Sequence, residues 1–144
     1  MSHQTFLPFA SLMTKTEKMK KILIVAALAV LTACGGRDFD DGVMQKTGKI
    51  YTINTETICN ARGFHGNTPV KVTVKKDVIV NVEALPNRET PRFFENVKQN
   101  MLPKFRDVKF KDYATVDGVT GSTISSNAVR ENMKAAFEYY TEHK

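Results

Sequence analysis

The stretch DGVTGSTISSNAVRENM at residues 117–133 organises the predicted fold, because it leads a turn of small residues into an amphipathic helix. Apolar side chains recur at helical spacing over residues 125–142, so one face of the helix should pack on a core. The residues of that face are Val129, Met133, Ala136, Phe137 and Tyr140. The sequence therefore predicts a packed C-terminal helix.

The turn before this helix is rich in glycine and hydroxyl groups. Gly121 tolerates backbone angles that other residues resist, and Thr120, Ser122, Thr123 and Ser125 crowd hydroxyls around the helix N-terminus. Unpaired N–H groups and a partial positive charge at that end favour an anion such as a phosphate. The residues alone leave two interpretations open: a capped helix with a flexible lead-in, or a phosphate site whose neighbouring hydroxyl is esterified.

DGVTGST resembles the flavinylation motif of the FMN-binding domain family, known from the FMN-carrying G subunit of the Rnf complex and the C subunit of sodium-translocating NADH:quinone reductase. The family motif reads roughly Asp-Gly-x-Ser/Thr-Gly-Ala-Thr, and a separate flavin transferase joins FMN to its last threonine through a phosphoester. The matching positions are Asp117, Gly118, Thr120, Gly121 and Thr123. The resemblance thus implies FMN on Thr123, with Gly121 and Ser122 orienting the phosphate and Asp117 bracing the turn or assisting flavin transfer. Ser122 stands where the family usually has alanine.

Residues 87–91 hold a second informative segment. Thr90 suits a helix N-cap and Pro91 a first helical residue, and Phe93, Phe94, Val97 and Met101 predict an apolar stripe behind them. Glu-Thr-Pro at residues 89–91 also resembles the family segment beside the isoalloxazine ring, which implies that Glu89 and Thr90 face the flavin. The Phe93-Phe94 pair is expected in the core, with a ring-stacking role as the alternative.

The N-terminal region has the features of an export signal. MKKILIVAALAVLTAC at residues 19–34 combines two lysines, a short apolar run and a small-residue ending, and it is too short for a good transmembrane span. Its last four residues resemble a bacterial lipobox, which implies lipidation of Cys34. We therefore predict an extension and signal peptide at residues 1–33, a lipidated tether at 34–41 and an FMN-binding domain at 42–144. An uncleaved anchor, or a signal peptide cut elsewhere, is the alternative.

A diacylglyceryl group on Cys34 would hold the domain at a membrane, since a single acyl chain anchors only marginally. We expect an extracytoplasmic protein on the bacterial cell membrane or outer membrane, with membrane-bound or extracytoplasmic redox partners. Cys59 would then lack an intramolecular partner, and we expect it to be buried in a strand, with no metal site.

Composition limits the other classes of function. The chain has 144 residues, 42% of them hydrophobic, which fits one domain. The formal net charge of +6 includes four lysines and one glutamate of residues 1–33, so removal of that segment leaves about +3. No tryptophan, basic-aromatic stripe or nucleic-acid fold signature is present, so nucleic-acid binding is not expected.

The middle of the chain reads as strands. β-Branched residues in 46–60 predict one or two strands, and ARGFHGN at 61–67 a turn in which His65 lies on the surface. Residues 69–74 and 78–85 predict a hairpin, which also resembles the opening of the family. One face should carry Val70, Val72 and Val74, and another Val78, Val80 and Val82.

The first helix should end at Leu102-Pro103. Residues 104–111 then interleave basic and apolar side chains, which favours an exposed strand, and residues 113–116 favour a last short strand. The basic residues are Lys104, Arg106, Lys109 and Lys111. A docking face for an acidic redox partner is the alternative to simple solubility.

Together these patterns predict an α+β fold, a small and mostly antiparallel sheet packed by two helices, with the flavin site between the helix N-termini. The leading functional hypothesis is a membrane-anchored flavoprotein electron carrier with FMN on Thr123, an electron-transfer protein or subunit rather than an independent enzyme. The alternatives are a lipoprotein that binds a ligand or protein partner without flavin, and a reductase that holds FMN non-covalently.

Overall fold

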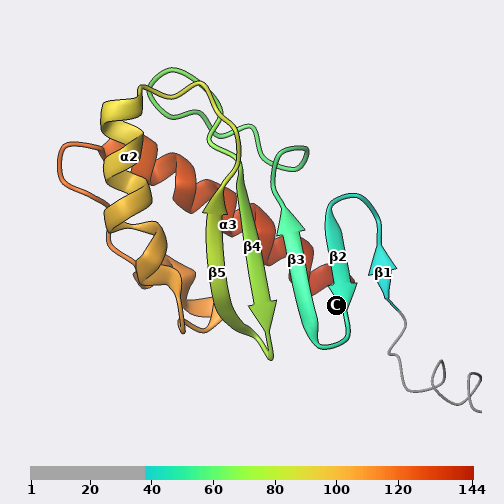
Figure 1. The fold of residues 1–144 in the computed structure, drawn as a ribbon. Coiled ribbons are helices and arrows are strands. Elements are labelled where there is room, and N and C mark those ends of the chain that lie inside the picture. The colour runs from blue at the N-terminus through green and yellow to red at the C-terminus, as the bar shows by residue number, and fades with distance from the viewer. Residues whose placement is uncertain (1–37) are drawn as a thin grey trace, which may run out of the picture. The chain divides into compact units, whose positions relative to one another are not determined.

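A computed structural model describes residues 38–144 (Figure 1). This part of the chain forms a five-stranded antiparallel sheet whose strands lie in chain order. The strands are β1 (Phe39–Asp40), β2 (Met44–Thr47), β3 (Ile50–Asn54), β4 (Val70–Lys75) and β5 (Val78–Ala84). The predicted signal peptide and Cys34 lie outside the described residues. Two residues assigned to the tether, Phe39 and Asp40, pair with β2 in the sheet.

Two helices follow the sheet, α2 (Pro91–Asn100) and α3 (Thr123–His143), and two 3₁₀ segments, η1 (Leu102–Phe105) and η2 (Phe110–Thr115), lie between them. In Figure 1, α3 crosses one face of the sheet, where it contacts β3 and β4, and α2 lies beside β5. Helix α2 also contacts α3. The α+β prediction is confirmed.

The core lies between the sheet and α3. Val70, Val72 and Val74 are fully buried on one face of β4, as their alternation predicted. Helix α3 contributes Val129, Met133, Ala136 and Tyr140, and Phe137 lies half-buried beside them. Strands β2 to β5, both helices and both 3₁₀ segments contribute side chains to this one core, so residues 38–144 carry what a folded domain requires.

The predicted face of β5 is wrong because the hairpin contains a β-bulge. Val72 pairs with Val82 but Val74 pairs with Ile79, so the register shifts by one residue within β5. Ile79 and Val82 are therefore buried, whereas Val80 is 41% exposed. A bulge of this kind changes which face a side chain occupies, and simple alternation along the sequence cannot show it.

The predicted strands at 104–111 and 113–116 are wrong. Pro103, which lacks the N–H that a strand needs, lies in the first turn of η1, and the chain turns again at η2. The backbone meets the sheet edge only briefly, where Val78 bridges Lys109. Phe105 and Phe110 are buried, which makes these segments a cover for the core rather than an exposed edge.

Three smaller expectations have mixed outcomes. Cys59 is half-buried in the loop after β3 rather than buried in a strand. In α2, Phe94, Val97 and Met101 follow the predicted stripe, but Phe93 is 39% exposed. His65 lies on the surface as predicted. No helix among the described residues has the length and apolarity required to cross a membrane.

Candidate functional site

The N-terminus of α3 has no side-chain cap. Ser122 occupies the N-cap position, but its Oγ donates a hydrogen bond of 3.0 Å to the backbone oxygen of Phe93 in α2. The first hydrogen bond of the helix runs from the N–H of Ser126 to the carbonyl of Ser122. The N–H groups at the start of α3 therefore point out of the helix end without the usual serine acceptor.

Gly121 shapes the approach to this helix end. Its φ of +81° lies in the left-handed region, which a residue with a side chain adopts only at a cost. The turn brings Thr123 to the first position of α3 with its side chain exposed, whereas Ser122 is only 5% exposed. The neighbouring residues Ser122 and Thr123 therefore differ in exposure, since the first is buried and the second faces solvent.

A hollow of about 310 Å³ lies beside Thr123. It is lined by residues 121–125 at the start of α3 and by Phe93 of α2. The remaining wall is Phe64 of the loop at residues 61–67, which contains Gly63 and Gly66 and is called the glycine-rich loop below. The two phenyl rings lie 6.1 Å apart between centroids, and Phe64 is 58% exposed. The hollow therefore combines apolar, aromatic walls with a helix N-terminus, which suits a flat ring that carries an anionic group.

Glu89 holds the glycine-rich loop against α3. Its Oε1 accepts hydrogen bonds of 2.9 Å from the N–H groups of His65 and Gly66, and its Oε2 accepts one of 3.1 Å from the N–H of Phe64. The hydroxyl of Ser125 in α3 donates to the same Oε2 at 2.9 Å. One carboxylate therefore connects the loop that carries Phe64 to the first turn of α3.

The ionisation of Glu89 depends on these contacts. Burial would raise the pKa of the carboxyl, but the donated hydrogen bonds outweigh it and hold the pKa below its usual range. Glu89 is only 7% exposed, so it is a buried anion whose lone pairs are occupied by protein donors.

Gly63 allows the loop to approach this carboxylate. A Cβ atom built on Gly63 would lie 2.6 Å from the Cδ atom of Glu89, which is far inside van der Waals contact. The glycine at this position is required by space rather than by backbone angle.

The structure brings only some of the predicted site residues together. Gly121, Ser122 and Thr123 line the hollow, whereas Thr120 and Asp117 are exposed outside its lining. Thr90 caps α2 by position, without a side-chain hydrogen bond. Glu89 is likewise absent from the lining, and its contacts support the loop. Ser125 was placed at the helix N-terminus from the sequence, but its contact with Glu89 was not predicted. Phe64 was not predicted as a site residue, although Gly63 and Gly66 beside it are typical of a loop that approaches another group closely.

Comparison with known proteins identifies the family of this chain. A sequence model of the FMN-binding domain family matches residues 63–138, more than half of the chain. The chain belongs to the FMN-binding domain family. The match runs from the glycine-rich loop through α2 and most of α3, so it includes every wall of the hollow beside Thr123. No curated protein and no solved structure matched the chain.

FMN is the cofactor of this family, and the residues around the hollow fit it. The uncapped start of α3 offers N–H groups to a phosphate, and Phe64 and Phe93 offer apolar contact to an isoalloxazine ring. The volume of about 310 Å³ is near the lower end of ligand pockets, which suits a partly exposed cofactor. The protein is therefore a flavin-binding protein.

Proposed function

We propose that this flavin-binding protein is a membrane-anchored electron carrier in which FMN is joined to Thr123 through a phosphoester. When bound, FMN supplies one- or two-electron chemistry, and the chain supplies its position and its electrostatic surroundings. The lipobox-like sequence ending at Cys34 supports anchoring outside the cytoplasm, with membrane-bound or extracytoplasmic redox partners.

The observation that carries the covalent proposal is the environment of the hydroxyls around the α3 N-terminus. The hydroxyls of Ser122 and Ser125 are buried and donate to Phe93 and Glu89, respectively. Thr120 is exposed but does not line the hollow. Thr123 alone among these four residues is both exposed and part of the lining, so its Oγ is the one accessible to a transferase and adjacent to the helix N-terminus.

Attachment requires an activated donor, in which the FMN phosphate is joined to a second nucleotide phosphate. In the step that we propose, Oγ of Thr123 attacks the FMN phosphorus, an O–P bond forms and the phosphoanhydride bond breaks. The hydroxyl proton is lost to a base of the flavin transferase, and a nucleotide monophosphate leaves. No electrons are transferred, and the partial positive charge of α3 stabilises the phosphodiester that remains.

The test is co-expression of the exported chain with a flavin transferase, followed by denaturation, a gel scanned for flavin fluorescence and intact mass. We expect retained fluorescence and a mass gain of one FMN less one water in the wild type and in Thr120→Ala, a matched change in the same turn. Both signals should be lost in Thr123→Ala. Flavin that is released on denaturation of the wild type would instead support the non-covalent alternative, an FMN reductase.

A further inference from the structure

Lysine side chains gather at the end of the domain opposite the start of α3. Two adjoining hollows of about 460 and 340 Å³ share Lys76, Asp77, Tyr140 and Lys144 in their linings. We call the six lysines of these linings the basic end: Lys46, Lys49, Lys76, Lys109, Lys111 and Lys144. Asp77 is the single acidic side chain in either lining.

The topology explains why these lysines meet. Ile50 pairs with Lys75, so the β2–β3 turn and the β4–β5 turn lie at the same end of the antiparallel sheet (Figure 1). The bridge between Val78 and Lys109 brings the segment before η2 to this end. The C-terminus of α3 reaches it as well, through the contact of Lys144 with Asp77.

Five of these six lysines form no ion pair with a carboxylate among residues 38–144. The Nζ of Lys144 and the hydroxyl of Tyr140 each donate to Oδ1 of Asp77 at 2.8 Å, so that carboxylate is occupied. The hydrogen bond from Lys144 is the main reason why the pKa of Asp77 lies below its usual range. Within residues 38–144, the other ion pairs are Lys71–Glu83 and Lys98–Glu95, so the remaining lysines of the basic end have no carboxylate within 4.0 Å.

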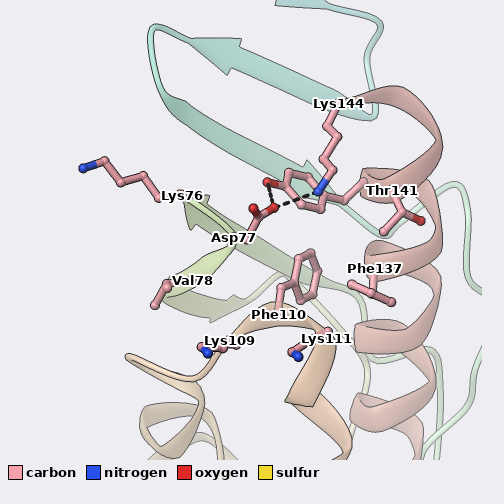
Figure 2. A pocket seen from close by; sticks show the side chains of 10 residues that line it. Lys76, Asp77, Val78, Lys109, Phe110, Lys111, Phe137, Thr141 and Lys144 are labelled. Atoms are coloured by element: carbon pink, nitrogen blue, oxygen red, sulfur yellow. Dashed lines mark hydrogen bonds and ion pairs between the residues drawn. The ribbon is translucent and has the colours of Figure 1, made fainter.

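Figure 2 shows how the side chains lie around the larger hollow. Lys109 and Lys111 lie on one side of Phe110, and Lys144 lies on the other side, against Asp77. The ammonium group of Lys76 extends away from the hollow. The lysines therefore present a spread of positive charge rather than a cage around one small ion, and such a spread suits an extended anionic surface.

The chain enters the described domain at this same end. Oδ1 of Asp38 accepts a hydrogen bond of 3.3 Å from the N–H of Gly48 in the β2–β3 turn, and Phe39 pairs with Lys46. A chain from Cys34 to Asp38 spans at most about 14 Å when fully extended. A lipid on Cys34 would therefore hold the basic end at the membrane surface, where a short tether raises the effective concentration of the second contact.

Two exposed apolar side chains favour a membrane over an acidic protein as the partner. Phe39 and Ile50, near the point of chain entry, are 41% and 40% exposed. An aromatic and an aliphatic residue beside lysines is the combination that binds the interface of an anionic bilayer.

We propose that the basic end docks on anionic phospholipid headgroups and thereby holds the flavin site away from the bilayer. The orientation of the domain on the membrane rests on the lipid anchor of the proposed function. The binding of the basic end to anionic headgroups does not depend on that anchor. Helix α3 has 21 residues and extends about 30 Å, so the hollow beside Thr123 faces the aqueous side. The redox partner then reaches the flavin from that side, as a protein, rather than as a carrier dissolved in the bilayer.

The test uses the chain from Cys34 onward with Cys34→Ser, which retains the whole core but carries no lipid. Its binding is measured by co-sedimentation with phosphatidylcholine vesicles, with and without phosphatidylglycerol. The variant Lys49→Gln/Lys109→Gln/Lys111→Gln removes three charges from the basic end. The control Lys71→Gln/Lys98→Gln/Lys134→Gln makes the same change in net charge elsewhere, and thermal melts establish that all three proteins fold.

We expect binding to the anionic vesicles alone, and its loss when salt rises from about 50 mM to about 500 mM. The basic-end variant should lose affinity by about a hundredfold, at about fivefold per lysine, and the control should stay within a few-fold of the parent. Absence of binding to anionic vesicles, or equal losses of affinity in the two variants, would overturn the proposal. An acidic protein would then be the favoured partner of the basic end. The flavin adduct and the lipid on Cys34 are measured separately on exported protein, so failure here leaves the proposed function standing.

Discussion

Replacement of Glu89 by glutamine is the most informative perturbation of the site's framework, because it keeps the shape of the side chain but changes one acceptor oxygen into a donor. At the Oε2 position, the new amide would face the N–H of Phe64, and the hydroxyl of Ser125 would have to turn and accept. At the Oε1 position, it would face the N–H groups of both His65 and Gly66. The first arrangement loses fewer hydrogen bonds, so we expect it.

The expected cost follows from that count. Loss of the partner of the Phe64 N–H costs about 1 kcal/mol, and the two remaining backbone bonds weaken by about 0.5 kcal/mol each when the acceptor becomes neutral. The total of about 2 kcal/mol should lower Tm by about 8 °C in a domain of this size. The loop that carries Phe64 should also exchange its amide hydrogens faster.

Thermal unfolding at pH 7, followed by circular dichroism, measures the effect. Glu95→Gln is the matched control, since Glu95 is exposed and pairs only with Lys98 and Gln99 on the surface of α2. Its Tm should change by less than about 2 °C. If Glu89→Gln shifts Tm no more than this control does, the carboxylate is not the brace that its contacts indicate.

The difference in Tm between the wild type and Glu89→Gln should depend on pH. Because the folded pKa of Glu89 lies below the unfolded value of 4.5, its stabilisation is complete above that value and is lost as pH falls through the folded pKa. The Tm advantage of the wild type over Glu89→Gln should therefore be constant from pH 7 to about pH 5 and shrink at lower pH. A constant difference down to pH 3 would show that Glu89 does not titrate in this way.

Three further substitutions test the walls of the site. Gly63→Ala places a Cβ 2.6 Å from the carboxylate of Glu89 and should lower the free energy of unfolding by about 2 kcal/mol or more. Urea unfolding measures this loss, and an unchanged midpoint would contradict the close approach. Ser125→Ala removes one donor to the same carboxylate and should cost about 1 kcal/mol, with little further loss when combined with Glu89→Gln, since the two share one interaction. Phe93→Ala should lower Tm by a few degrees, because the ring is only 39% exposed, and should weaken the binding of free FMN to the unmodified chain about fivefold in a fluorescence titration. Equal affinity would remove Phe93 from the site.

The spacing of apolar residues along the sequence predicted those helices and strands that bury one face. The helical spacing of Val129, Met133 and Tyr140 predicted α3, and the alternation of Val70, Val72 and Val74 predicted β4, because each pattern matches the period of one element. The segment after α2 was misread because its alternating lysines and phenylalanines match a strand, although Pro103 and the burial of the phenyl rings produce two 3₁₀ turns.

The candidate site was predicted only in part, because some of its contacts join residues that are far apart in the sequence. The turn before α3 is contiguous in sequence, so its motif around Thr123 could be recognised by resemblance. Glu89 meets the loop at 64–66 and Ser125 only through the tertiary fold, across separations of 23 to 36 residues, and no periodic pattern signals such a contact. The hydrogen bond from the Ser122 hydroxyl to the backbone oxygen of Phe93 in α2 is another tertiary contact, and the sequence did not predict it.

The most direct test of the covalent flavin is peptide mapping of the exported, flavinylated protein. Trypsin should release residues 112–130 as one peptide, since Lys111 and Arg130 flank the motif. Tandem mass spectrometry of that peptide should place the FMN phosphate on Thr123 and leave Thr120, Ser122 and Ser125 unmodified. An adduct on any of those three residues, or a flavin-free peptide from a chain that had received the transferase, would contradict the account.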